Sequence, residues 1–233
     1  MKRGFYTLAE NRSMKLGVSL LRLEGDTSAF LRPGQFVQIE LPGHFLKRPF
    51  SVCDWDRDSF SVIVEAAGSG TAELLALPAG TSLLVHTGLG NGFTPPDSLG
   101  KGDGLLLIGV GTGLSPMAGL ASRYPEAKVL LAFRRLEDAF GAELFTGHEV
   151  HLTTDLLPAI SEIPHRYFCA CGSEAAMRAV SLHDSADGQI AFDVRMGCGF
   201  GACMGCSKMT VHGYARVCTE GPVFGKEELL WED

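Results

Sequence analysis

The chain has 233 residues, of which 45% are hydrophobic and 20% are charged, so its composition is that of an ordinary folded globular protein. The formal net charge of −7 leaves no excess of basic side chains to neutralise phosphates, which argues against nucleic acid as a partner. The most apolar stretch, Leu105–Val110, is far shorter than the roughly 20 residues that cross a bilayer. The amino-terminal residues contain no apolar core of signal-peptide length, so we expect no membrane insertion and a cytoplasmic protein.

Residues 1–97 contain short strand-like patterns separated by turn residues. Their regular spacing predicts an antiparallel β-barrel, interrupted by one helix over about residues 72–77. The patterns are GFYTLAE (4–10), KLGVSLLRL (15–23), GQFVQIELPG (34–43), SFSVIVEAAG (59–68) and TSLLVHTG (81–88).

The rhythm changes over residues 98–190, where apolar runs alternate with helix-like stretches. This alternation predicts a parallel sheet covered by helices, which is a nucleotide-binding α/β architecture. The apolar runs are LLLIGVG (105–111), KVLLAFR (128–134), VHLTTD (150–155) and YFCACG (167–172), and the helical stretches are SPMAGLASRY (115–124) and SEAAMRAVSLH (173–183).

Residues 191–233 are rich in glycine and cysteine and lack periodicity. This segment is too small to build its own core, so we expect something other than burial to hold it. Cys198, Cys203, Cys206 and Cys218 follow the spacing of a plant-type 2Fe-2S site, and the residues between the first three are mostly small. The alternative is a structural zinc site, which more usually shows two close cysteine pairs. An odd total of seven cysteines fits a disulfide framework poorly.

Two short motifs in the barrel region are candidates for phosphate and ring binding. Arg48, Pro49, Phe50 and Ser51 begin a strand, and arginine offers a fork of donors to a phosphate; a lone arginine beside proline is otherwise a common surface residue. Gly68–Thr71 opens a helix with Thr71 as its expected N-cap, and free N–H groups there would suit a pyrophosphate or simply form a capped turn.

Two strand-to-helix junctions in the second region resemble nucleotide loops. Gly109, Gly111 and Gly113 lie between an apolar strand and a helix that we expect to begin with Ser115 as cap and Pro116 at its first position. The spacing departs from GxGxxG, and no acidic residue follows the next strand. Cys171 and Gly172 end another strand, and Ser173 is the expected cap of the following helix. Carboxyl ends of parallel strands meet at one edge, so these loops should converge.

Taken in order, RPFS, GSGT, GLGNGF, GVGTGLSP and CGSEAAM resemble the ferredoxin-NADP reductase superfamily over nearly the first 190 residues. The carboxyl-terminal cysteine segment is similar to that of the electron transfer subunits of NAD-dependent dihydroorotate dehydrogenases. The resemblance implies FAD, a 2Fe-2S cluster on the four cysteines, NADH as electron donor or acceptor, and a heterotetramer with two FMN-containing catalytic subunits for pyrimidine biosynthesis. It implies FAD contacts from Arg48, Pro49, Phe50, Ser51, Ile63, Val64, Glu65, Gly70 and Thr71.

The chain departs from the superfamily pattern at two places. Phe50 stands where tyrosine is usual, and Ser173 follows Cys171 and Gly172 where proline is frequent. Arg134 and Arg135 follow a strand where an adenosine phosphate could lie, but Glu137 and Asp138 would repel it, and NADH is preferred on resemblance.

The resemblance predicts an oxidoreductase in which the cofactors perform the chemistry. No proton-transferring side chain is evident, so we name no catalytic residue; the seven histidines are expected to be surface or capping residues. Alternatives are a reductase subunit for a hydrogenase, a transhydrogenase or an oxygenase, although Cys198 stands where transhydrogenase small subunits carry Asp, and a zinc-bound, non-catalytic docking module.

Overall fold

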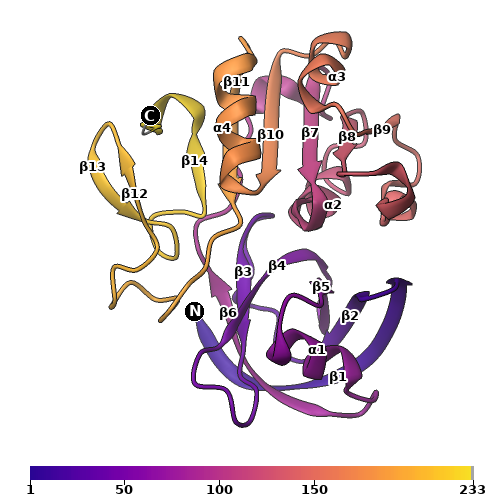
Figure 1. Ribbon diagram of the computed structural model, residues 1–233, viewed down its shortest axis with the longest axis vertical. Coiled ribbons are helices and arrows are strands. Elements are labelled where there is room, and N and C mark those ends of the chain that lie inside the picture. The colour runs from indigo at the N-terminus through magenta and orange to yellow at the C-terminus, as the bar shows by residue number, and fades with distance from the viewer. Residues whose placement is uncertain (232–233) are drawn as a thin grey trace.

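The computed structural model describes residues 1–231 and contains a barrel, an α/β sheet and a carboxyl-terminal segment lying beside both (Figure 1). The barrel is closed, with strand order β1-β2-β5-β4-β3-β6 and antiparallel neighbours throughout, which confirms the predicted antiparallel barrel. Its strands are β1 (Lys2–Lys15), β2 (Val18–Glu24), β3 (Phe36–Ile39), β4 (Arg48–Trp55), β5 (Ser59–Glu65) and β6 (Ser82–Leu89).

Side chains alternate across the barrel wall, as strand geometry requires. In β3, Val37 and Ile39 belong to the apolar cluster inside the barrel, while Phe36 belongs to a cluster outside it. In β5, Val64 likewise points inward. The outward positions of β3, β4 and β5 are therefore free to contact the other parts of the molecule.

The helix inside the barrel region, α1 (Ser69–Ala76), begins three residues earlier than predicted. Its N-cap is Gly68, and Thr71 lies one turn into the helix rather than at the cap. The Thr71 hydroxyl accepts hydrogen bonds from the backbone N–H groups of Ala67 and Gly68, at 2.8 and 3.1 Å. Thr71 thus binds the N–H groups that precede it from a position inside the helix, so α1 begins near Gly68 and not after Thr71.

The second unit is a six-stranded sheet in the order β14-β11-β10-β7-β8-β9, parallel except for the β11–β14 pair. This confirms the predicted parallel sheet. The helix α3 and the strands β11 and β14 were not among the predicted elements, and the domain boundary expected at residue 190 falls within β11. The elements are β7 (Leu105–Val110), α2 (Leu114–Ala121), β8 (Lys128–Ala132), β9 (Val150–Thr153), α3 (Leu156–Glu162), β10 (Tyr167–Gly172), α4 (Glu174–His183), β11 (Asp187–Phe192) and β14 (Val223–Gly225).

The predicted cap of α2 is wrong, whereas Ser173 is indeed the N-cap of α4. Gly111–Gly113 form a 3-10 turn that runs directly into α2, so Gly113 takes the cap position. Ser115 and Pro116 then lie within the helix and are buried. Because the turn formed by Gly111–Gly113 already has helical geometry, α2 begins before Ser115, the residue that the sequence pattern favours as its cap.

The carboxyl-terminal segment shares its core with the sheet, contrary to the expectation that burial would not hold it. It contributes a hairpin of β12 (Ser207–Thr210) and β13 (Gly213–Arg216) and then the edge strand β14. Met196, Val217, Phe224 and Leu229 are buried in the cluster that also contains Phe36 of the barrel and the face of the sheet under α4. No helix within residues 1–231 is long and apolar enough to cross a membrane.

A buried ion pair links the ends of α3 and α4. His165 Nε2 lies 2.7 Å from Asp184 Oδ2, and the two side chains are 7% and 6% exposed. The hydrogen bond to Asp184 raises the pKa of His165. Burial would raise the pKa of Asp184, but hydrogen bonds from His165 and the Ala186 N–H lower it overall. His165 Nδ1 also lies 2.7 Å from the carbonyl of Ile163, the C-cap of α3, so this histidine lies at a helix end and is tied to Asp184 as well.

This pair makes stability depend on pH in a defined direction. Because the pKa of His165 is raised in the folded state, its contribution to stability is complete below the unfolded pKa of 6.5 and is lost as the pH rises through the folded pKa. Because the pKa of Asp184 is lowered, its contribution is complete above the unfolded pKa of 3.8 and is lost as the pH falls through the folded pKa. Asp184→Asn should lower the free energy of unfolding at pH 6 by about 1–3 kcal/mol and reduce its decrease between pH 6 and 8.5. Urea denaturation at both pH values measures this.

Glu149→Gln is the matched control, because it removes the carboxylate of the exposed His151–Glu149 pair. An exposed pair contributes little, so this variant should change the free energy of unfolding by less than about 0.5 kcal/mol. Equal effects of the two substitutions would contradict the assignment.

Candidate functional site

A continuous groove runs between the barrel, the sheet and the carboxyl-terminal segment. It consists of two adjoining cavities of about 200 and 720 Å³ that share Pro49, Ala67, Thr71 and Asp193 in their walls. An elongated ligand would fit this shape better than a compact one.

The smaller cavity brings together residues predicted from three separate motifs. Phe50, Ser51, Ile63 and Glu65 line it from β4 and β5 of the barrel, while Gly113 and Cys171 line it from the carboxyl ends of β7 and β10. The neighbouring Thr112 was not predicted, although it lies inside the quoted glycine motif. The two sheet loops that were expected to converge thus meet at Gly113 and Cys171, and the barrel strands β4 and β5 form the other side of the same cavity.

Four of the predicted residues do not line either cavity, and packing explains three of them. Val64 points into the barrel core. A Cβ on Gly109 would lie 2.7 Å from the Leu114 Cα, and one on Gly172 would lie 2.7 Å from the Val110 Cβ. These glycines therefore allow close packing of strand against helix and strand against strand. Gly111 differs, because it has open space around it and a φ of +58° that favours glycine.

The larger cavity contains Arg48, held directly above the start of α1. A Cβ on Gly70 would lie 2.5 Å from Arg48 Nη2, so only glycine allows the guanidinium to lie there. Arg48 Nη2 is 2.9 Å from His44 Nδ1, and His44 Nε2 is 2.9 Å from Glu73 Oε2. These hydrogen bonds from Arg48 through His44 to Glu73 hold the guanidinium beside the N–H groups of the first helical turn, which is a pattern suited to a phosphate.

A polar bridge fixes the barrel against the sheet at the other end of the groove. Ser115 Oγ donates to the Ser51 carbonyl at 3.0 Å and lies 2.9 Å from the Cys53 thiol. A Cβ on Gly119, one turn further along α2, would lie 2.4 Å from the Cys53 carbonyl. The helix and β4 are therefore in tight contact, and the width of the groove is set by this contact.

Asp193 is a groove residue that sequence reasoning missed. It follows β11 and lines both cavities. Asp193 is an exposed residue of the groove wall, and desolvation by the surrounding protein atoms raises its pKa. No motif marks it, because its position depends on where β11 ends.

Three of the predicted cysteines lie in the loop before the β12–β13 hairpin, and Cys218 lies just after it. Burial would raise the pKa of Cys198, but the backbone N–H groups of Phe200, Cys203 and Ala202 and the Cys203 thiol lower it to about 6. The Ala202 N–H lies 3.2 Å from the Cys198 sulfur. Burial and the neighbouring Cys206 thiol raise the pKa of Cys218 to about 12.

This pairing fits a binuclear cluster. Within residues 1–231, no three His, Cys, Asp or Glu side chains are gathered so that they could hold one metal ion. The thiols instead contact each other as Cys198 with Cys203 and Cys206 with Cys218, and each iron of a 2Fe-2S cluster takes two protein ligands. The backbone N–H groups aimed at Cys198 are the donors that such sulfurs accept. Four thiols in two pairs, with backbone N–H donors at Cys198, are therefore a donor set that fits a 2Fe-2S cluster.

The cysteine segment is fastened to the barrel by Asn91, in the GLGNGF motif. Its Nδ2 donates to the carbonyls of Glu220 and Val223 at 2.9 and 2.7 Å, and its Oδ1 accepts from the Val223 N–H at 3.1 Å. Beside it, a Cβ on Gly90 would lie 2.4 Å from Pro222. The motif thus positions the segment that carries Cys218.

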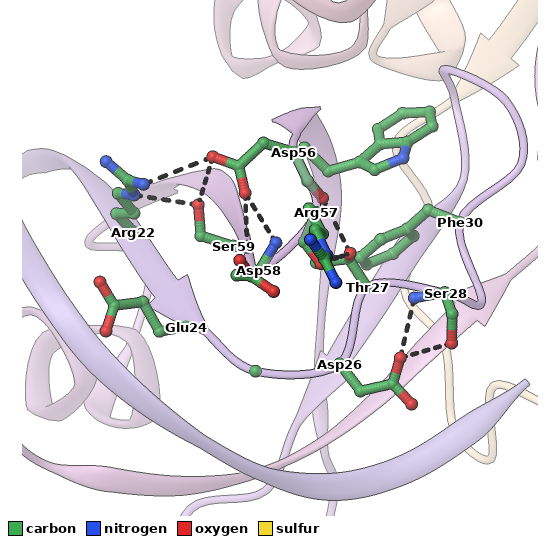
Figure 2. Close-up of a pocket in the computed structure, with 12 residues that line it drawn as sticks. Arg22, Glu24, Asp26, Thr27, Ser28, Phe30, Asp56, Arg57, Asp58 and Ser59 are labelled. Carbon is green, nitrogen blue, oxygen red and sulfur yellow. Dashed lines mark hydrogen bonds and ion pairs between the residues drawn. The ribbon is translucent and has the colours of Figure 1, made fainter.

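Another hollow, of about 910 Å³, lies on the barrel between β2 and the β4–β5 turn (Figure 2). Its polar groups bind one another: Arg22 Nε donates to Ser59 Oγ at 3.0 Å, and Thr27 Oγ1 donates to the Asp56 carbonyl at 2.8 Å. These hydrogen bonds stabilise the turn. The hollow contains none of the predicted site residues.

Comparison with known proteins connects both halves of the site to one family. Residues 193–230 match the family model described as the iron-sulfur cluster binding domain of dihydroorotate dehydrogenase B. The electron transfer subunit of dihydroorotate dehydrogenase B (NAD(+)) from Caldanaerobacter subterraneus subsp. tengcongensis is 32% identical over 221 residues, covering 85% of this chain and 87% of the relative. The chain belongs to this family of electron transfer subunits. The Bacillus mycoides subunit, also 32% identical, covers 90% and 92%.

Solved structures support the fold assigned to this dihydroorotate dehydrogenase B family member. An NADH-dependent reduced ferredoxin-NADP oxidoreductase structure matches 98% of this chain and 90% of its own with a TM-score of 0.82 at 20% identity. Phthalate dioxygenase reductase matches 78% and 64% with a TM-score of 0.60 at 16% identity. At these identities the likeness concerns the arrangement of barrel and sheet.

Removing the Asn91 side chain should loosen the cysteine segment of this family member. Asn91→Ala leaves the Glu220 and Val223 backbone groups without their partner, so we expect the segment to be destabilised by about 2 kcal/mol. Hydrogen exchange of the Val223 amide should become faster, and the purified protein should retain less iron per chain.

Asn11→Ala provides a matched control, because Asn11 Nδ2, in β1, bridges the carbonyls of Leu75 and Leu77 at the end of α1. That variant should leave the exchange of Val223 and the iron content unchanged. Normal iron content in Asn91→Ala would show that the clamp does not support the cysteine segment.

Proposed function

We propose that this electron transfer subunit binds FAD in the groove and a 2Fe-2S cluster on Cys198, Cys203, Cys206 and Cys218. It moves electrons between NADH and the FMN-bearing catalytic subunit of dihydroorotate dehydrogenase. The observation that carries the proposal is that one segment supplies both sites: Asp193 lines the groove, and Cys198 follows five residues later. A flavin in the groove and a cluster in the loop would therefore be neighbours.

The pyrophosphate of FAD belongs in the larger cavity. Arg48 supplies a forked cation there, and Gly70 and Thr71 present the first turn of α1. The flavin ring belongs in the smaller cavity against Pro49, Phe50 and Ser51, with Ile63 and Glu65 from β5 below it. Val64 would contribute through its backbone alone, because its side chain is inside the barrel.

NADH would approach from the sheet side of the smaller cavity, where Thr112, Gly113 and Cys171 form the wall. Arg135 is already neutralised, because it lies 2.8 Å from both Glu137 and Asp138. The acidic pair around Arg135 disfavours the extra phosphate of NADPH and supports NADH as the nucleotide.

FAD, when bound, supplies the conversion between hydride transfer and single-electron transfer. The chain positions the reactants and excludes water. The Ser115 bridge keeps barrel and sheet at a fixed separation, and the Arg48–His44–Glu73 chain keeps the phosphate site in place before the ligand arrives. The cysteine loop would hold the cluster through which electrons leave the groove.

The surface around the cysteine loop suits the catalytic subunit. Phe200 and Met204 in this loop are about half exposed, and Phe45 in the β3–β4 loop is fully exposed. Lys47 lies 5.8 Å from the Phe200 ring, which joins the two loops into one face. Exposed aromatic and methionine side chains are typical of protein interfaces. A heterotetramer with two of each subunit and a cytoplasmic location, where unpaired thiols persist, complete the proposal.

The cluster ligands can be tested separately from the flavin. Cys203→Ser should abolish the paramagnetic resonance signal of the reduced, anaerobically reconstituted protein and stop NADH-dependent orotate reduction with the catalytic subunit. Because the groove is untouched, NADH should still bleach the FAD absorbance. Because Cys203 is exposed, we expect the variant to fold.

Cys169→Ala is the control, since Cys169 is buried in β10 away from the groove walls. It should keep the resonance signal and the coupled activity. A wild-type protein that is colourless and magnetically silent after reconstitution would refute the proposed cofactors, and a fully loaded protein inactive with the catalytic subunit would refute the proposed acceptor.

Arg48→Ala should weaken FAD binding by about 10- to 100-fold, because it removes charge-assisted hydrogen bonds to phosphate. Fluorescence titration of the flavin-free protein with FAD measures this. Arg57→Ala removes an exposed arginine from the β4–β5 turn and should leave the affinity unchanged. Similar losses in both variants would indicate a general charge effect instead of a phosphate site.

A further inference from the structure

Gln38 lies in β3, the barrel strand next to the groove-lining strand β4. In β3 it pairs with Pro49 of β4 on one side and with His86 of β6 on the other. Pro49 lines both cavities of the groove. Because Val37 and Ile39 fill the barrel interior, the Gln38 side chain leaves the barrel on the outer face.

The Gln38 amide is buried and incompletely satisfied. The residue is 1% exposed, and its Nε2 has no hydrogen-bond partner within residues 1–231. A buried donor without an acceptor costs about 1–3 kcal/mol, so glutamine at this position needs a reason. Leucine or methionine would fill a similar volume without that cost.

The amide packs against the backbone of the cysteine loop. A Cβ on Gly199 would lie 2.1 Å from Gln38 Nε2, so the amide rests against the backbone next to Cys198. Gly199 has a φ of +77°, which turns the loop at this point. The missing side chain and the left-handed backbone together let the loop close over the amide.

We propose that Gln38 donates a hydrogen bond from Nε2 to a sulfur of the bound cluster, either the Cys198 thiolate or an inorganic sulfide. The inference rests on the proposed 2Fe-2S site. Cluster sulfurs accept hydrogen bonds, and an unpartnered donor facing the loop of Cys198 and Cys203 is the group that would supply one. Gln38 is thus a positioning residue that ties the cluster to the strand beside the flavin groove.

Such a hydrogen bond strengthens as negative charge accumulates on the sulfurs, so it favours the reduced cluster. Gln38→Leu should therefore make the cluster about tenfold harder to reduce relative to a fixed couple, which corresponds to a 59 mV lower midpoint potential for one electron. The midpoint is measured by redox titration of the intact FAD-loaded subunit, followed by paramagnetic resonance. The FAD midpoint, followed by absorbance, should stay the same.

Gln38→Glu keeps the shape of the side chain but replaces the donor with a carboxylate. It should lower the cluster midpoint at least as much as Gln38→Leu, and the shift should shrink at low pH as the carboxyl group gains a proton and can donate again. This pH dependence would not arise from a purely packing role.

Gln35→Leu is the matched control. Gln35 is a buried glutamine adjoining β3, but both ends of its amide have partners: Oε1 accepts from the Leu31 N–H at 2.6 Å, and Nε2 donates to the Gly90 carbonyl at 3.0 Å. This variant should lose stability without moving the cluster midpoint.

The possible outcomes separate the two proposals. A wild-type subunit that binds no cluster refutes the proposed function, whereas a loaded wild type and loaded Gln38 variants with equal midpoints refute the role of Gln38. If Gln38→Leu fails to retain the cluster, Gln38→Glu titrated at low and high pH decides the question, and a midpoint independent of pH overturns the inference.

Discussion

The packing of residues 193–230 against both the barrel and the sheet is the constraint on which the site depends. Three kinds of contact hold this segment: β14 pairs with β11, Asn91 binds the backbone around Val223, and apolar side chains such as Phe224 enter the core under α4. Since Asp193 emerges from β11 directly into the groove, the cysteine loop has to lie beside whatever the groove binds. Adjacency of the two sites is a result of the fold.

Glycines serve two distinct purposes along the groove. Gly70 leaves room for the Arg48 guanidinium beside the first turn of α1, and Gly111 adopts a left-handed backbone angle, whereas Gly109, Gly113 and Gly172 allow the strands and loops of the sheet to approach one another. At Gly113 a Cβ would lie 2.1 Å from the Cys171 carbonyl, so the two loops of the sheet touch there. A glycine-rich motif in this chain therefore marks tight assembly of the sheet edge as much as phosphate binding.

The barrel and the parallel sheet could be predicted from the sequence because their strands and helices have local periodic signals, and the cluster site could be predicted from the spacing of its cysteines. Cap positions could not: Thr71 and Ser115 are good cap residues by type, yet one stabilises α1 from within and the other bonds to β4. β14 has only three residues and acquires strand geometry from its partner β11. Asp193 and Gln38 carry no motif, since their importance arises from which segments meet around them.

The antiparallel strand β14 also protects the molecule. It lies at the end of the sheet, covering a row of backbone N–H and C=O groups on β11 that would otherwise be open to another chain. Phe192, at the end of β11, contacts the rings of Phe224 and Trp231 and would be uncovered together with that row. The iron-sulfur segment is therefore part of the fold of the sheet. A chain shortened before it would expose the unpaired edge of β11, and self-association through that edge would compete with folding.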